Sequence, residues 1–201
     1  MANTASPYGL KPVKRVDGMP YAGATDTFLI NPAGFADNIF NGQVVSIDTN
    51  GYVTLVTATG ADASTNAFPA GTIGVFMGCE YVSTEGQVIN SQYYPAGITG
   101  VVTAKVVTDP NVVFQAQLDD PGAQAVLGAN TFFAASQVDG SGDSVGNTRT
   151  GNSTSALDAT VQTAAAAFRI VGFASPAGDA KTDVLVKFNP AQHSYLNATG
   201  I

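Results

Sequence analysis

Apolar and polar residues alternate along several stretches of the chain, as in strands that bury one face. The longest stretch begins at Thr72 and reaches Tyr81, with Gly74, Gly78 and Glu80 on one face. The other face is expected to be continuous apolar core, formed by Ile73, Val75, Met77, Cys79 and Tyr81. Glycines opposite a core face predict a close backbone approach or a bulge, as expected where a sheet curls towards a barrel.

A β-hairpin is predicted where two apolar runs, residues 44–48 and 52–56, flank Thr49-Asn50-Gly51. The Asn-Gly pair readily supplies the positive φ angles of a type I′ turn. Other β-branched and aromatic runs predict further strands. They cover residues 87–94, 98–108, 111–118, 168–174 and 181–188, with a turn at Asp109-Pro110.

The remaining segments differ in character. Residues 1–25 contain Pro and Gly at a spacing that breaks every regular element, which predicts an extended arm. Residues 119–128 predict one short helix, with an acidic N-cap, Pro at its first position and Gly at its end. Residues 138–154 are rich in Gly, Ser, Asn and Thr, which predicts a long, exposed, flexible loop. For residues 155–167 the pattern leaves open a helix, a strand or an irregular segment.

Together these elements predict a mainly β fold with a single β-barrel or β-sandwich domain over residues 26–188. An extended N-terminal arm and a C-terminal tail, residues 189–201, are expected to reach neighbouring subunits. Composition agrees, because only 11% of residues are charged, as in a chain of strands and turns. The 45% share of hydrophobic residues excludes intrinsic disorder.

Charge is distributed unevenly along the chain. The formal net charge is −7, yet Lys11, Lys14 and Arg15 give the first 16 residues a charge of +3 without any acid. No Lys or Arg lies between Val16 and Ala104. Because an acidic body repels nucleic acid and anionic membranes, we predict that neither is a partner. The basic arm is expected to contact an acidic protein surface.

Few residues are candidates for chemistry. Cys79 stands alone, which predicts a buried thiol, and His193 is the only histidine and is expected at the surface or at an interface. Asp139-Gly-Ser-Gly-Asp143 opens like a calcium loop, but Ser144 and Thr150 occupy the positions that need Gly and a bidentate Glu. No nucleotide-binding or zinc-peptidase motif is present. We therefore predict no enzyme activity, cofactor, metal or small-molecule substrate.

The ends of the chain bear on where the protein is made. The first residues lack the apolar centre of a secretion signal, and no stretch approaches the roughly 20 apolar residues of a membrane helix. A soluble protein that is synthesised in a cytoplasm is expected.

Three stretches of the chain carry a resemblance to a known family. The first is residues 5–13 (ASPYGLKPV) with 18–25 (GMPYAGAT), the second is 74–81 (GVFMGCEY) with 91–97 (SQYYPAG), and the third is 182–189 (TDVLVKFN). They resemble a family of bacteriophage virion proteins found beside the major capsid protein, some of whose members are head cement or decoration proteins. The region 139–167 has no counterpart in this resemblance.

The resemblance implies a virion protein of the phage head, made in the cytoplasm of the host bacterium. It also implies contacts to the major capsid protein and a homo-oligomer, with dimer and trimer both open. The hypothesis is a cement or decoration subunit that stabilises the capsid shell. Its predicted contact residues are Pro7, Tyr8, Lys11, Lys14, Arg15, Tyr21, Tyr93 and Tyr94. Deleting residues 1–20 is expected to abolish capsid binding and to leave the body folded.

Two other functions are weighed against this hypothesis. A receptor-binding module of a phage tail or fibre is also β-rich and oligomeric, and exposed Tyr93 and Tyr94 would then line a carbohydrate site. A small hydrolase would need a carboxylate pair such as Asp119 and Asp120, but adjacent positions need not converge and helix capping explains both.

Overall fold

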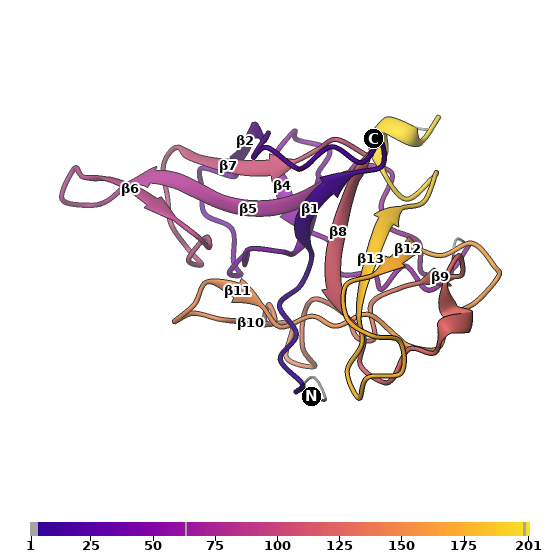
Figure 1. Ribbon diagram of the computed structural model, residues 1–201. Helices are drawn as coiled ribbons and strands as arrows, with labels where there is room; N and C mark the ends of the chain where they lie inside the picture. Colours follow the sequence, from indigo (N-terminus) through magenta and orange to yellow (C-terminus); the bar gives the residue numbers. More distant parts are fainter. Residues whose placement is uncertain (1–3, 63, 199) are drawn as a thin grey trace.

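Almost all regular structure in the computed structural model, which describes residues 4–62, 64–198 and 200–201, is β-strand (Figure 1). In chain order the strands are β1 (Lys11–Arg15), β2 (Asp26–Ile30), β3 (Val44–Ile47), β4 (Val53–Leu55), β5 (Thr72–Val82), β6 (Val88–Ser91), β7 (Val102–Val107), β8 (Val112–Gln117), β9 (Asn130–Thr131), β10 (Gly146–Asn147), β11 (Asn152–Ser153), β12 (Phe168–Phe173) and β13 (Asp183–Phe188). Two short 3-10 helices, η1 (Gln124–Val126) and η2 (Ser194–Leu196), complete the fold. Within the described residues no helix is long and apolar enough to cross a membrane. The predicted mainly β class is confirmed.

Five strands close into a small barrel. They are hydrogen-bonded in the order β3-β4-β2-β7-β5, and β5 returns to pair with β3. All these pairings are antiparallel except β2 with β4, and β6 extends the sheet beyond the barrel by pairing with the far end of β5. The barrel core contains the buried side chains of Ile30, Ile39, Val45, Val53, Ile73, Phe76, Cys79, Tyr94, Val102, Ala104 and Val106.

A second sheet, in the order β1-β8-β13-β12-β9, packs on the outside of this barrel. The barrel contributes outward-facing Val44, Val75 and Val107 to the layer between them, which we call the sheet core. Phenylalanines fill most of its centre, and the rings of Phe168 and Phe188 lie 5.0 Å apart. The predicted barrel is thus packed against a second sheet, and side chains from both layers form the sheet core between them.

Strand β5 bends at two glycines. Gly74 and Gly78 have φ angles of +138° and +144°, which side chains of other L-residues rarely adopt. The pairing register of β5 slips near each of them. A Cβ atom at Gly74 would overlap the carbonyl oxygen of Val107. The predicted bulge and close backbone approach are therefore confirmed.

The prediction of one continuous core face on this strand is wrong. Ile73, Cys79 and Tyr81 belong to the barrel core, but Val75 and Met77 face the sheet core. Each bulge adds one residue and so exchanges the two faces of the strand beyond it. The strand thus supplies side chains to both cores.

The hairpin predicted over residues 44–56 is present as β3 and β4, but its turn differs. Only Gly51 has a positive φ angle in this turn, whereas a type I′ turn needs two such residues. The Gly51 N–H donates to the Asp48 carbonyl at 3.0 Å, and the Asp48 N–H donates to Tyr52 at 2.9 Å. This is a three-residue connection that ends in a left-handed glycine.

The predicted N-terminal arm is built into the fold. Residues Lys11–Arg15 form β1, an edge strand that pairs with β8, and the side chain of Leu10 is fully buried in the sheet core. The expectation that Pro breaks this segment is wrong, because an edge strand with a bulge tolerates Pro12. Deleting residues 1–20 would therefore remove a strand and a core side chain, so the body is not expected to keep its stability.

The predicted loop at 138–154 contains more structure than expected. Strands β10 and β11 form a short hairpin within it, and Ser153 is buried. The side chain of Gln137 is completely buried at the start of this loop, where it accepts from the Val44 N–H at 2.8 Å and donates to the Val56 carbonyl at 2.7 Å. These amide bonds hold the loop against the barrel.

Two other segments are less regular than predicted. The helix expected over 119–128 is reduced to η1, whose N-cap Ala123 makes no side-chain bond. Residues 155–167, left open by the sequence, form neither a helix nor a named strand.

The first part of the C-terminal tail packs on the body, whereas Tyr195, Leu196 and Ile201 are exposed. Asn189, Gln192 and His193 are buried, and the Gln192 carbonyl oxygen of the side chain accepts from the Phe68 N–H at 2.9 Å. The tail therefore closes one end of the sheet core.

The bend in β5 gives a test of the fold. We expect Gly74→Ala to lower the free energy of unfolding by about 3 kcal/mol or more, because it adds both φ strain and an overlap with backbone. The control is Gly86→Ala, at a φ of +81° with nothing within 4 Å, which should lower it by about 1 kcal/mol. Urea unfolding followed by circular dichroism measures both, and equal losses would contradict the role given to the close approach.

Candidate binding groove beside the N-terminal strand

The N-terminal segment is fixed to the body by backbone contacts before β1 begins. The Leu10 N–H donates to the Gly42 carbonyl at 2.9 Å, and the Gly9 N–H donates to Ser155 at 3.2 Å. A Cβ atom at Gly9 would lie 2.6 Å from the Gly42 carbonyl oxygen. The two backbone segments therefore pass too closely for any residue other than glycine at position 9. The segment before β1 therefore has a defined path.

Tyr8 crosses from this segment to the second sheet. Its hydroxyl donates to the Asp183 carboxylate on β13 at 3.1 Å. Burial of the ring, followed by the nearby Asp183 charge, raises the pKa of Tyr8 above its ordinary value. The phenol therefore stays protonated and acts as a hydrogen-bond donor.

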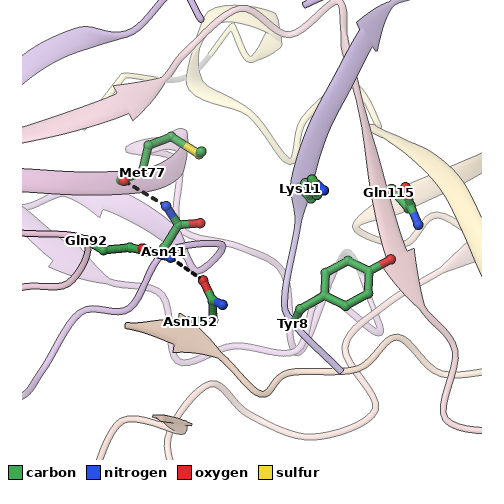
Figure 2. A pocket seen from close by; sticks show the side chains of 7 residues that line it. All are labelled: Tyr8, Lys11, Asn41, Met77, Gln92, Gln115 and Asn152. Carbon is green, nitrogen blue, oxygen red and sulfur yellow. Dashed lines mark hydrogen bonds between the residues drawn. The ribbon is translucent and has the colours of Figure 1, made fainter. Parts of the chain in front are cut away.

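A groove of about 410 Å³ lies between Tyr8 and the barrel (Figure 2). One wall carries Tyr8, Lys11 and Gln115, and the other carries Asn41, Met77, Gln92 and Asn152. We call it the amide groove. Within the second wall the Asn41 side-chain amide donates to the Met77 carbonyl at 2.7 Å, and the Gln92 amide donates to Asn152.

A smaller hollow of about 190 Å³ shares Tyr8 and Asn152 with the amide groove, and the β10–β11 hairpin borders it. Amide donors and acceptors and one ammonium group face the groove, and no carboxylate is among its lining residues. Such a surface suits polar or anionic groups of a partner. It offers no acid–base pair.

Of the predicted bases, Lys11 and Lys14 are exposed on β1, and the part of the chain that the structure describes holds no ion pair with either. Arg15 differs, because its guanidinium lies 3.7 Å from Asp17 and 3.5 Å from Asp109. The structure thus places two free ammonium groups on one strand, with a partly neutralised guanidinium at its end.

The predicted aromatic contacts do not lie together. Tyr94 is fully buried in the barrel core, where its hydroxyl accepts from the Phe35 N–H and donates to the Ile98 carbonyl, both at 3.0 Å. Tyr93 is half-buried and stacks on Phe40 with ring centres 5.5 Å apart. The prediction of Tyr94 as a contact residue, and of an exposed Tyr93–Tyr94 carbohydrate site, is wrong because buried hydroxyl partners hold Tyr94 inside.

Pro7 and Tyr21 are half-buried beside the N-terminal segment. Pro7 lines the smaller hollow, and the Tyr21 hydroxyl donates to the Ala24 carbonyl at 2.7 Å. Pro7 therefore lines the hollow next to the amide groove, whereas Tyr21 stabilises the turn after β1.

Asp119 and Asp120, the carboxylate pair that a hydrolase would need, have separate structural roles. The Asp119 carboxylate accepts from the Ala159 N–H at 2.8 Å, and Asp120 lies 3.5 Å from the Lys181 ammonium. Neither caps a helix, so the capping interpretation is wrong as well. In the calcium-like loop, Asp139 accepts from the Ser141 and Asp143 N–H groups.

His193 is buried, not at the surface as predicted, and its ring packs against Phe188 and Tyr195. Its Nδ1 accepts from the Tyr195 N–H at 3.2 Å. Burial lowers the pKa of His193 to about 4. Cys79 is buried as predicted, and burial raises the pKa of its thiol to about 12. Both groups are therefore uncharged near neutral pH.

Besides Met77, which was predicted only as a core residue, the sequence did not indicate the four polar lining residues Asn41, Gln92, Gln115 and Asn152. They come from four separate places in the chain, and isolated Asn and Gln residues carry no spacing signal. No family model, curated protein or solved structure matches this chain.

The buried histidine predicts a pH dependence of stability. The unfolded chain binds the proton with a pKa near 6.5, and the folded chain binds it only near 4. Because unfolding takes up a proton between these values, stability should fall as pH drops from 6.5 to 4, by about 3 kcal/mol at the end.

The His193→Asn variant keeps an acceptor for the Tyr195 N–H but does not titrate in this range. Urea unfolding of both proteins at a series of pH values isolates the histidine contribution. Parallel pH profiles of the two proteins would show that His193 is not the group responsible.

Proposed function

We propose that the chain is a structural subunit of a phage head that binds the major capsid protein and stabilises the shell. The three stretches that resemble head cement and decoration proteins support this proposal. The proposal gives the protein no catalytic role and places its work in protein–protein contact. The predicted binding element was a basic, extended arm. The proposal replaces it with the folded strand β1, which carries the same basic residues.

The observation that carries the proposal is the pair of free lysines on β1. Lys11 and Lys14 project from an edge strand whose path is fixed by Leu10 and by pairing with β8. A rigid basic strip binds an acidic surface without first losing the entropy of a disordered arm. The remainder of the chain is net acidic, so this strip is where an acidic shell surface would be attracted.

Repetition on a symmetric shell would strengthen weak contacts. An exposed ion pair contributes only about 0.2–1 kcal/mol by itself. A homo-oligomer that presents several copies of β1 at once gains from a high effective concentration after the first contact. The proposed subunit therefore works as a multivalent clamp rather than as a tight single-site binder.

The test is binding of the purified chain to phage shells that lack it. We expect the double variant Lys11→Gln/Lys14→Gln to bind about two- to thirtyfold more weakly, since two exposed ion pairs together contribute roughly 0.4–2 kcal/mol. Co-sedimentation with shells at increasing salt measures the affinity, and the difference from the unmodified chain should shrink as salt screens the charges.

The matched control is Lys105→Gln/Arg149→Gln, which removes the same charge from the barrel and from the β10–β11 hairpin. It should bind like the unmodified chain. If both doubles weaken binding equally, net charge rather than the β1 strip is responsible, and the proposal fails.

The amide groove favours one second candidate, a carbohydrate-binding module of a tail or fibre. Amide side chains beside one aromatic ring, here Tyr8, are suited to sugar hydroxyls. Oligosaccharides from the surface of the host bacterium, titrated into the protein and followed by NMR, should then shift the side-chain amide signals of Asn41 and Gln115.

A further inference from the structure

The β5–β6 hairpin carries an open strand edge. Figure 1 shows this hairpin extending away from the second sheet, with β6 at the outer side. Strand β6 pairs with β5 through Tyr81–Ile89 and Val82–Val88, and within the described residues it has no strand on its other side.

The register shows which backbone groups face outwards. The Ser83 N–H donates to the Gln87 carbonyl at 2.8 Å, so these two residues form a hydrogen-bonded pair of the hairpin. Hydrogen-bonded pairs alternate with non-bonded pairs along an antiparallel ladder. Ile89 is therefore bonded to β5, whereas the N–H and C=O groups of Val88 and Asn90 point away from it.

The edge strands of the second sheet, β1 and β9, have outer backbone groups that are hydrogen-bonded to neighbouring segments, unlike those of β6 within the described residues. On β1 the Arg15 N–H donates to Met19, and the Val13 carbonyl accepts from Tyr21. On β9, Asn130 exchanges backbone bonds with Gln162. Residues 83–91 contain no Pro or Lys, the residues that usually block an edge.

Both faces of the hairpin are apolar near this edge. On one face Val82 pairs with Val88, and the two are 56% and 64% exposed. Val101, 72% exposed, directly precedes β7 next to the Tyr81–Val102 pair, and we call these three residues the valine row. On the other face Tyr81, Ile89 and Ile98 border a hollow of about 370 Å³. Val82 lines this hollow as well, and an added strand would continue the valine row and place side chains beside the hollow.

The charge around this edge is acidic. Glu80 and Glu85 are exposed on the hairpin, and no Lys or Arg lies between Val16 and Ala104. The nearby Lys105 ammonium is held by the Asn90 side chain at 2.8 Å. A second copy of the chain would bring the same acidic hairpin to the contact, so electrostatics favours a basic partner over self-pairing.

We propose that the β6 edge binds an extended segment of a partner protein as an added β-strand. The segment is apolar on both faces and is flanked by Lys or Arg. Main-chain bonds to Val88 and Asn90 supply affinity, and the valine row and the hollow select the side chains. This inference does not rest on the proposed function, since it uses a different surface from β1.

The probe is a fluorescein-labelled synthetic peptide of alternating valine and threonine with a lysine at each end. Fluorescence anisotropy with the full chain should show saturable binding, weaker for the same peptide with glutamate ends or with a central proline. Val88→Pro removes an outward N–H and keeps the bonds to β5, so it should weaken binding at least about fivefold. Circular dichroism checks that the variant is folded.

Val82→Thr/Val88→Thr keeps every backbone N–H and tests the apolar row if the proline variant does not fold. Val171→Thr, at an exposed valine of β12, is the matched control and should bind normally, as should Lys11→Gln/Lys14→Gln. If Lys11→Gln/Lys14→Gln binds shells as tightly as the unmodified chain, the proposed function is refuted and this inference still stands.

Equal binding of all three peptides, or no binding, overturns the inference. Concentration-dependent dimerisation in sedimentation equilibrium that Val88→Pro abolishes would also overturn it, because the occupant would then be a second copy.

Discussion

Two cores share one strand in this protein, and that strand bends only because glycine occupies two positions. At Gly74 the backbone of β5 approaches Val107 so closely that a Cβ atom has no room. The bulges let β5 close the barrel by pairing with β3, and they turn Val75 towards the sheet core. Beyond Gly78 the same strand stays paired with β7 on one side and pairs with β6 on the other, so the proposed β6 edge depends on this bend.

The two surfaces differ in chemistry and lie on different layers. Strand β1 belongs to the second sheet and presents free ammonium groups, whereas the β6 edge belongs to the barrel sheet and presents open backbone groups beside acids. The two proposed surfaces therefore suit different partners, since β1 carries ammonium groups and the β6 edge lies beside carboxylates. Rigid elements carry both surfaces, which limits the entropy lost on binding.

Alternation and turn residues predicted the β class and most strands, because those signals are local. The face of a strand on which a side chain lies, and whether that side chain is buried, were harder to predict. One added residue in β5 reversed the face of Val75, and burial of Tyr94 and His193 depends on segments distant in sequence. The amide groove escaped prediction for the same reason, since its walls meet only after the N-terminal segment docks. Lys11 and Lys14 were found because a basic cluster stands out in an acidic chain.

The second sheet draws its strands from both ends of the chain, in the order β1-β8-β13-β12-β9. During synthesis β1 leaves the ribosome long before its partner β8, and β8 precedes β13. The sheet core can therefore close only after β13 has been synthesised, and pairing of segments so distant in sequence is expected to slow folding of this layer. A nascent β1 that carries two lysines and Pro12 is poorly suited to pairing with other chains during that interval.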